Sequence, residues 1–169
     1  MPPLADLHAS GEDGAAPTAA AAAGVDTSRL THLVGYAASR ASIQLKKPFK
    51  RLLGPLQLKA VEFSVLVLVA SNRGLNQKQL GAALDLSAPN LAVILDRLAE
   101  RGLVERVRST IDRRAQQLQL TPAGRALTER AEGIAATMEN EALRVLSPAE
   151  RALLIELLLK VARARPARR

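Results

Sequence analysis

Apolar residues recur three and four positions apart through most of the chain, the spacing that gathers side chains on one face of a helix. The first such pattern begins after Asp26 and Thr27, either of which can cap a helix. Pro48 and the Gly54-Pro55 pair are expected to end this helix, because proline has no amide proton to donate. Its apolar positions are Leu30, Leu33, Val34, Ala37, Ala41 and Leu45.

The next apolar segment, at residues 58–71, is compatible with two structures. Its residues from Phe63 to Val69 favour a buried strand by propensity alone. The length of the segment and its flanks also allow a buried helix. Both structures stay open at this point.

Two short helices with a turn between them follow. Asn76 can cap the first, which is expected to end near Leu84. After a tight turn at Asp85-Leu86, Ser87 can cap the second, which is expected to end at Gly102. The inner face of this second helix consists of Leu91, Ile94, Leu95 and Leu98.

A hairpin and two longer helices complete the pattern. Apolar and polar residues alternate over 103–107 and 116–120 around a polar Arg/Asp/Ser tip, which predicts a β-hairpin. Thr121-Pro122 then opens a long helix, and the capping box Ser147-Pro148-Ala149-Glu150 opens the last one. The apolar stripe of the long helix is Leu127, Ala131, Ile134, Met138, Ala142 and Val145.

The last helix, RALLIELLLKVARA, is apolar on nearly every side, too much for a helix with one wet face. We expect most of it to be buried, most simply in a homodimer. Helix, turn, helix and hairpin in this order form a winged helix-turn-helix, a mainly α fold with a small β-hairpin wing. We expect a flexible tail over residues 1–25 and one domain over 26–169. Within it, the DNA-binding lobe spans about 58–121, and dimerisation helices span about 26–53 and 122–163.

The net charge of the chain indicates an anionic partner. The 169 residues include 24 Lys and Arg against 16 Asp and Glu, a net charge of +8. The four acidic residues before Arg29 have no basic neighbour, so the remainder is more basic still. Such a balance favours nucleic acid or an anionic membrane surface. An aromatic content of 2% argues against single-strand and RNA binders, which stack bases on several aromatic rings.

The chain lacks the residues that several classes of function require. The chain has no Cys and two His, so thiol chemistry and zinc sites are not expected, and we predict no metal and no cofactor. It has no Gly-rich phosphate loop and no Ser/His/Asp setting, so we predict no catalytic residues. It lacks the basic region of a signal peptide and any run of about 18 apolar residues. A cytoplasmic protein without membrane contact is expected.

Four short motifs, in order and spacing, carry a strong resemblance to a known family. They are Asp96-Arg97-Leu98, Arg101-Gly102-Leu103-Val104, Asp112-Arg113-Arg114 and Leu120-Thr121-Pro122-Ala123-Gly124. With these motifs the chain resembles the MarR family of bacterial transcriptional regulators from about Leu30 to Ala162. The resemblance implies a dimeric repressor on a palindromic operator. It also implies release of the DNA when a small, often aromatic molecule binds between the dimerisation region and the DNA-binding lobe. Members that sense peroxide or copper through cysteine are not models for this chain.

The helix opened by Ser87 is the expected reader of the major groove, because the N-terminal residues of such a helix meet the base edges. Asn90 can bond adenine through both amide atoms, and Ala92 or Val93 can contact a thymine methyl group. Ser87 can hold a phosphate or act as a plain N-cap. Since polar base readers are few, DNA shape is expected to add to specificity. The candidate contacts are Ser87, Ala88, Pro89, Asn90, Ala92, Val93 and Arg97.

The hairpin tip carries a second set of candidates. A narrow A/T-rich minor groove attracts arginine, and the resemblance places Arg114, two residues after Asp112, in that groove. Asp112 repels phosphate and is expected to orient a neighbouring arginine. The alternative is a solvated run of charges. The wing candidates are Arg106, Arg108, Asp112, Arg113 and Arg114.

The sequence gives weaker support for an effector site than for DNA binding. His32, Tyr36 and Arg40 recur every four residues and would form one polar stripe on the first helix. Arginine can pair with a carboxylate, and tyrosine and histidine can bond hydroxyl groups or stack on a ring, so a small aromatic carboxylate fits them. A partly solvated helix face is the alternative. A second basic cluster, open to a phosphate-bearing effector such as an acyl-CoA or simply solvated, is Lys46, Lys47, Lys50 and Arg51.

Three other functions remain as alternatives. An effector-independent architectural protein would bind DNA without any ligand response. A helical protein-interaction module would be basic only for solubility, and its binding to a duplex would lack the steep salt dependence of phosphate contacts. An enzyme would have to work with serine and carboxylates alone, and no motif supports one.

Overall fold

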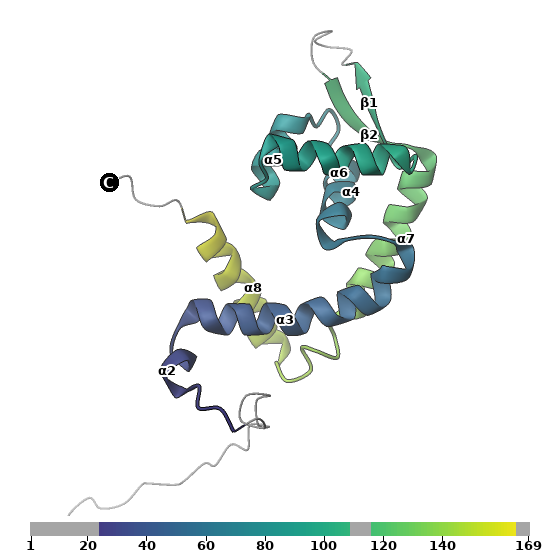
Figure 1. Cartoon of the computed structure of the whole chain (residues 1–169). Coiled ribbons are helices and arrows are strands. Elements are labelled where there is room, and N and C mark those ends of the chain that lie inside the picture. Colours follow the sequence, from purple (N-terminus) through teal and green to yellow (C-terminus); the bar gives the residue numbers. More distant parts are fainter. Residues whose placement is uncertain (1–23, 109–115, 165–169) are drawn as a thin grey trace, which may run out of the picture. The chain divides into compact units, whose positions relative to one another are not determined.

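The computed structural model describes residues 24–108 and 116–164. It is a winged helix-turn-helix with flanking helices, as predicted (Figure 1). The chain divides into two compact units, Met1–Ala41 and Ser42–Arg169. Nearly all of the predicted tail lies outside the described residues. In chain order the elements are α2 (Ser28–Thr31), α3 (Val34–Leu53), a 3-10 turn η1 (Gly54–Leu56), α4 (Ala60–Ser71), α5 (Gln77–Leu84), α6 (Ala88–Glu100), β1 (Val104–Arg108), β2 (Gln116–Leu120), α7 (Pro122–Met138) and α8 (Pro148–Arg163).

The ambiguous apolar segment is a helix, α4, at the centre of the larger unit. Its Val65, Leu66 and Val69 are buried in the core that α5, α6, α7 and the hairpin share. At its start, the Lys59 N–H donates to Oε2 of Glu62 at 2.8 Å, which satisfies an amide that has no partner within the helix. Burial of this face, with Phe63 and Leu68 packed partly buried against the same core, outweighs the strand preference of its β-branched residues.

The helix-turn-helix has the limits that its capping residues predict. The Asn76 side chain accepts from the Gln79 N–H at 2.9 Å and starts α5, while Asp85, with φ of 52°, ends it in a left-handed turn. Gly102 is left-handed as well, with φ of 64°, and the Leu103 N–H donates to the Leu98 carbonyl at the end of α6. On α6, Leu91, Leu95 and Leu98 are buried and Ile94 is partly buried, which confirms the predicted inner face.

The wing is a two-stranded antiparallel hairpin. Val104 pairs with Leu120 and Arg108 with Gln116, so β1 begins one residue later than predicted. The Leu118 N–H donates to the Leu75 carbonyl at 2.8 Å, which fastens the hairpin to the segment before α5. Val104, Leu118 and Leu120 enter the core.

Two predicted helix ends are wrong. Pro48 lies inside α3, which continues to Leu53 before Gly54-Pro55 ends it as expected. Pro48 and Leu53 are the buried residues of α3. Their packing offsets the backbone hydrogen bond that proline, which has no N–H, cannot donate. The long helix α7 ends at Met138 instead of reaching Val145, whose side chain is 80% exposed. The described part of this single chain buries neither Ala142 nor Val145, so their apolar pattern has nothing to pack against.

Helix α8 carries the largest exposed apolar surface. Its capping box is formed, since the Ser147 N–H donates to Oε2 of Glu150 at 2.8 Å and the Ser147 hydroxyl accepts from the Glu150 N–H. Bonds from the Ser147 hydroxyl and N–H lower the pKa of Glu150, so the box loses its stabilisation only as the pH falls through that lowered pKa. None of its described residues is buried, and its leucines, Ile155 and Val161 are 36–66% exposed. The predicted burial of this helix is therefore not supplied by the described residues of one chain. No single helix among them is long and apolar enough to cross a membrane.

One close backbone approach yields a stability prediction. The first turn of α7 crosses the end of α6, where the Thr121 hydroxyl donates to the Gly102 carbonyl at 2.6 Å. A Cβ at Gly124 would overlap the Leu103 carbonyl oxygen, whereas a Cβ at Gly133 would meet nothing within 4 Å. We expect Gly124→Ala to lower the free energy of unfolding by about 1–3 kcal/mol. In the same helix, Gly133→Ala should raise it by about 0.5–1 kcal/mol. Urea unfolding at fixed protein concentration measures both, and a stabilised Gly124→Ala variant would contradict the close approach.

Candidate nucleic-acid interface

The outward face of α6 is open to solvent. Its first turn, Ala88, Pro89 and Asn90, is exposed, and Val93 is 70% exposed, while the leucines of the opposite face are buried. Ala92 is partly buried between the two faces. The face that sequence reasoning assigned to the major groove is thus available, with the Asn90 carboxamide near its N-terminal end.

Ser87 occupies the N-cap position of α6 without making a capping hydrogen bond through its side chain. Pro89, at the second helical position, has no N–H to offer. The caps of neighbouring helices behave differently, because Asn76 and Thr121 both accept a backbone N–H. A hydroxyl that makes no cap bond keeps its hydrogen-bonding capacity for a phosphate at the helix N-terminus.

One wing arginine contacts α6. Nη2 of Arg106 donates to Oδ1 of Asp96 at 2.7 Å, and this charge-assisted bond links β1 to α6. Sequence reasoning gave the orienting role to Asp112 and missed Asp96, although Asp96 stands in one of the motifs that carry the resemblance. Arg108 is exposed at the end of β1. Asp112, Arg113 and Arg114 lie outside the described residues.

Arg97 has a partner inside the protein. Its Nη1 lies 3.2 Å from Oε1 of Glu62, whose side chain is 2% exposed, while the Arg97 side chain is 42% exposed. Sequence reasoning named Arg97 as a DNA contact and did not foresee this pair, because nothing in the sequence relates α4 to α6 at these positions. The DNA contact stays a prediction.

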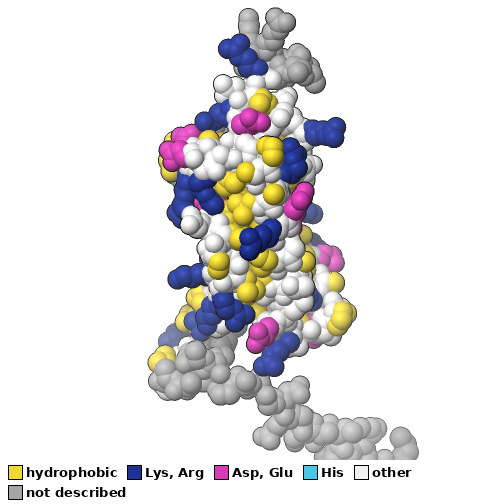
Figure 2. Space-filling model, turned by 90° about the vertical axis from the view of Figure 1, so that its right-hand side faces the viewer, with side chains coloured by type: hydrophobic (Ala, Val, Ile, Leu, Met, Phe, Trp, Pro, Cys, Tyr) yellow, Lys and Arg dark blue, Asp and Glu magenta, His cyan; other side chains and the backbone are white. Residues whose placement is uncertain are grey.

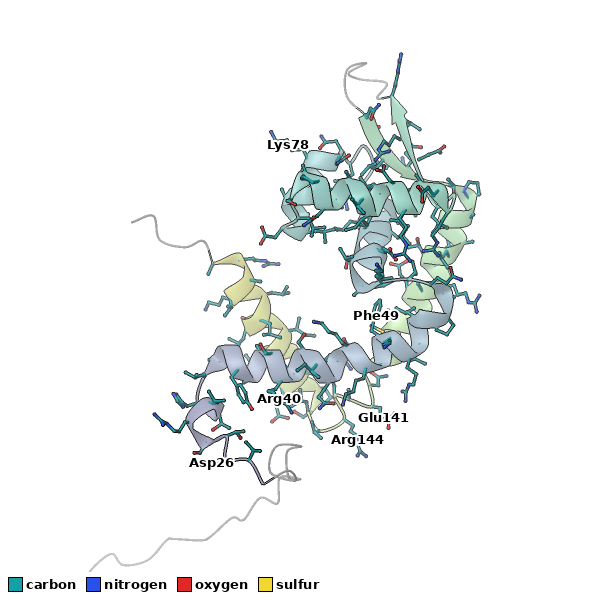
Figure 3. The ribbon with its side chains drawn as sticks, in the orientation of Figure 1. Asp26, Arg40, Phe49, Lys78, Glu141 and Arg144 are labelled. Atoms are coloured by element: carbon teal, nitrogen blue, oxygen red, sulfur yellow. The ribbon has the colours of Figure 1, made fainter. Side chains whose placement is uncertain are left out.

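A basic side chain also lies on the first helix of the motif. Further Lys and Arg side chains are spread over the face of the molecule drawn in Figure 2. Lys78 is exposed and projects outward from α5 (Figure 3), although sequence reasoning did not single it out. It also lines a cavity of about 420 Å³ between α5 and α6, together with the apolar Leu86, Ala88 and Leu91. A cation on the first helix of the motif adds to the potential that attracts a phosphate backbone.

The candidate effector residues do not lie on one continuous helix. α2 ends at Thr31, and α3 begins at Val34, so His32 lies in the break, exposed. Tyr36 and Arg40 lie one turn apart on α3 and are partly buried. The predicted stripe is therefore reduced to these two residues.

Part of the second basic cluster lines a cavity in the larger unit. The cavity measures about 330 Å³ and lies between the second half of α3 and the segment after α7. Lys47, Arg51 and Arg144 supply three cations, and Glu141, 3.9 Å from Arg51, supplies one carboxylate. Glu141 and Arg144 are labelled in Figure 3. Pro48, Met138 and Ala142 add apolar walls, so the cavity suits an anion attached to an apolar group. The described residues contain no group of three His, Asp or Glu that could hold a metal ion.

Comparison with known sequences places these features in one family. The model of the MarR family matches residues 58–115, a range that contains α4, α5, α6 and β1. The organic hydroperoxide resistance transcriptional regulator of Bacillus subtilis is 33% identical over 103 residues, 61% of this chain and 68% of that protein. A transcriptional regulatory protein for the hcr operon of Thauera aromatica is 34% identical over 101 residues, 60% of this chain. The match spans 61% of the length of the Thauera protein.

Solved structures give the same result over more of the chain. The transcriptional repressor CouR bound to a 23-mer DNA duplex has a TM-score of 0.77 and 37% identity, and the match covers 82% of this chain and 99% of CouR. CouR bound to p-coumaroyl-CoA has a TM-score of 0.74 and 35% identity, covering 83% and 99%. The likeness therefore extends beyond the helix-turn-helix to the flanking helices.

Proposed function

The chain belongs to the MarR family of transcriptional regulators, and we propose from this that it is a dimeric repressor released from its operator by a small aromatic acid or the CoA thioester of one. The observation that carries DNA binding is the exposed face of α6. On it, Asn90 is exposed and the Ser87 hydroxyl makes no capping hydrogen bond, and the Arg106–Asp96 ion pair holds the wing beside it. CouR, similar over 99% of its length, was solved on a DNA duplex.

In this proposal α6 enters the major groove with its N-terminal turn first. A helix about 10–12 Å across fits that groove. Asn90 reads an adenine, Val93 contacts a thymine methyl group, and Ser87 bonds a phosphate. Arg108, Arg113 and Arg114 of the wing reach the adjacent minor groove and its phosphates. The other proposed contacts are Ala88, Pro89, Ala92, Arg106 and Asp112. Arg97, which the sequence also suggested, is left out of this set because it pairs with Glu62.

The dimer follows from the exposed leucines of α8. Apolar side chains half exposed along a whole helix leave a surface that water disfavours, and a second copy of the same helix covers it. A two-fold dimer presents two copies of α6 to half-sites one helical turn apart, about 34 Å, which matches a palindromic operator. We place the dimerisation helices at about 26–53 and 122–163, around the lobe at about 58–121.

The effector is proposed from two groups of residues. Tyr36 and Arg40 suit a hydroxylated aromatic carboxylate, and the cations Lys47, Arg51 and Arg144 suit phosphates of a CoA thioester. CouR, which was solved with p-coumaroyl-CoA, supports this ligand class. To release the operator, the ligand has to bind the DNA-free dimer more tightly than the DNA-bound one.

Selection from a random duplex library tests DNA recognition. We expect wild type to enrich a palindrome, and Asn90→Ala to lose discrimination at one base position per half-site, at a cost of about 1–3 kcal/mol. Arg114→Ala should weaken binding to all duplexes, reduce the preference for A/T-rich flanks and lower the salt slope by about one. Arg130→Ala, an exposed cation on α7, is the control and should change neither. Identical specificity profiles for the Asn90 and Arg114 variants would contradict the assigned roles of helix and wing.

Sedimentation tests the dimer. The wild type should sediment as a dimer at micromolar concentration, and Leu154→Glu with Leu158→Glu should dissociate it, because each partner would bury unpaired carboxylates. Val93→Glu, which also places a charge on an exposed apolar site, should remain dimeric. A folded wild-type monomer at these concentrations would disprove the proposal.

Titration of the operator complex with p-coumarate, p-coumaroyl-CoA and free CoA tests the effector. Arg40→Ala should bind the operator as wild type does and lose the response to the free acid, because the carboxylate loses its partner. Arg144→Ala should lose the response to the thioester only. Arg29→Ala, on α2, is the control. If Arg40→Ala abolishes operator binding or leaves every response unchanged, Arg40 is not an effector residue.

A further inference from the structure

Three side chains join the second half of α6 to the chain between η1 and the first turn of α4. Nη1 of Arg97 lies 3.2 Å from Oε1 of Glu62. Arg101, the residue that follows α6, donates from Nη1 to the Gln57 carbonyl at 2.9 Å and from Nη2 to the Leu56 carbonyl at 3.1 Å. These residues are 35 to 45 positions apart in the sequence, so the contacts are tertiary.

Glu62 is the buried member of this set. Its side chain is 2% exposed, and both carboxylate oxygens have partners, Arg97 on Oε1 and the Lys59 N–H on Oε2. No described side-chain oxygen or nitrogen in the core lacks a hydrogen-bond partner. A buried carboxylate without its cation is strongly disfavoured, so Glu62 holds the Arg97 guanidinium against α4.

The carbonyl pair that Arg101 binds is also held in place. Gln57 is left-handed, with φ of 53°, and its N–H donates to the Gly54 carbonyl at 2.8 Å. A left-handed conformation is unfavourable for a residue with a Cβ, so the surrounding contacts stabilise it. The turn brings the Leu56 and Gln57 carbonyls into reach of one guanidinium.

We propose that Glu62, Arg97 and Arg101 are positioning residues that set the angle of the recognition helix on α4, an inference that rests on the proposed DNA binding. Ten residues separate Arg97 from Ser87, about 15 Å along a helix. A tilt of about 5° at the Arg97 end moves the reading end by about 1.3 Å, which exceeds the range of a good hydrogen bond to a base. Arg97 therefore acts on specificity through Glu62 and does not contact DNA.

Glu62→Gln tests this with little change in volume. The amide keeps an oxygen for the Lys59 N–H and removes the charge that attracts Arg97. The probes are a duplex enriched by wild type and a random duplex of equal length. We expect affinity for the enriched duplex to fall tenfold or more, in keeping with the roughly tenfold that one hydrogen bond to a charged group represents. Affinity for the random duplex should stay within about twofold. The lost discrimination should spread over all positions that α6 reads, unlike the single position lost in Asn90→Ala.

Companion variants separate the proposal from its rivals. If the pair acts as a unit, Glu62→Gln with Arg97→Gln is no worse than either single variant. Glu129→Gln, an exposed carboxylate on α7, is the matched control. Arg101→Lys keeps the charge but cannot hold both carbonyls in the same geometry, and should lower the same specificity ratio. This variant tests the proposal if Glu62→Gln does not fold.

Three results would overturn the inference. A lower melting temperature with an unchanged specificity ratio would make the set a purely structural feature. Weaker binding of Arg97→Gln to the random duplex, with a salt slope reduced by about one, would make Arg97 a phosphate contact. An unchanged ratio of enriched-duplex to random-duplex affinity in Arg101→Lys would show that the bonds from Arg101 to the two carbonyls do not set the angle of the helix. Failure of the wild type to enrich any duplex would instead refute the proposed DNA binding, so the two failures are distinguishable.

Discussion

An apolar helix has to bury its large side chains, and α4 does so through Val65, Leu66 and Val69. Its burial determines where α5, α6, α7 and the hairpin lie, since each of them contributes buried residues to the core that α4 occupies. Polar groups at its start extend the same arrangement. Glu62, buried in the first turn of α4, is compatible with the core only because the Lys59 N–H and Arg97 satisfy it. The ion pair therefore links α6 directly to α4, in addition to the packing of α6 against α5 and β1.

The two faces of α6 differ in their surroundings: one is buried in the core and the other is exposed to solvent. Leucines on the inner face are fully buried and make the helix part of the core. The outer face near Ser87 and Asn90 is exposed and has no such constraint, which is why it is the face proposed to bind DNA. Side chains at the margins, Asp96 toward the wing and Arg97 toward α4, connect the helix to its neighbours. A buried leucine face and the exposed face proposed to bind DNA are thus combined in thirteen residues.

Outside the winged lobe, the described residues of one chain leave apolar surface uncovered. Helix α8 buries none of its residues, and the apolar pattern that continues past α7 ends in turns with Val145 exposed. The proposed dimer accounts for both features, because a partner would supply the surface that one chain lacks. A repressor built in this way couples assembly to the spacing of its two reading helices, which is where a ligand can act.

Capping residues and periodicity in the sequence determined most of the local structure. Asn76, Gly102 and Thr121 mark helix ends because their side chains or positive φ satisfy backbone groups within a few residues. The same local signals predict α6, the hairpin and the division of α6 into a buried and an exposed face. Tertiary structure alone decided that residues 60–71 form a helix, that Pro48 continues one, and that Arg97 pairs with Glu62. These outcomes depend on which distant side chains are buried together, and burial can outweigh local propensity by several kcal/mol.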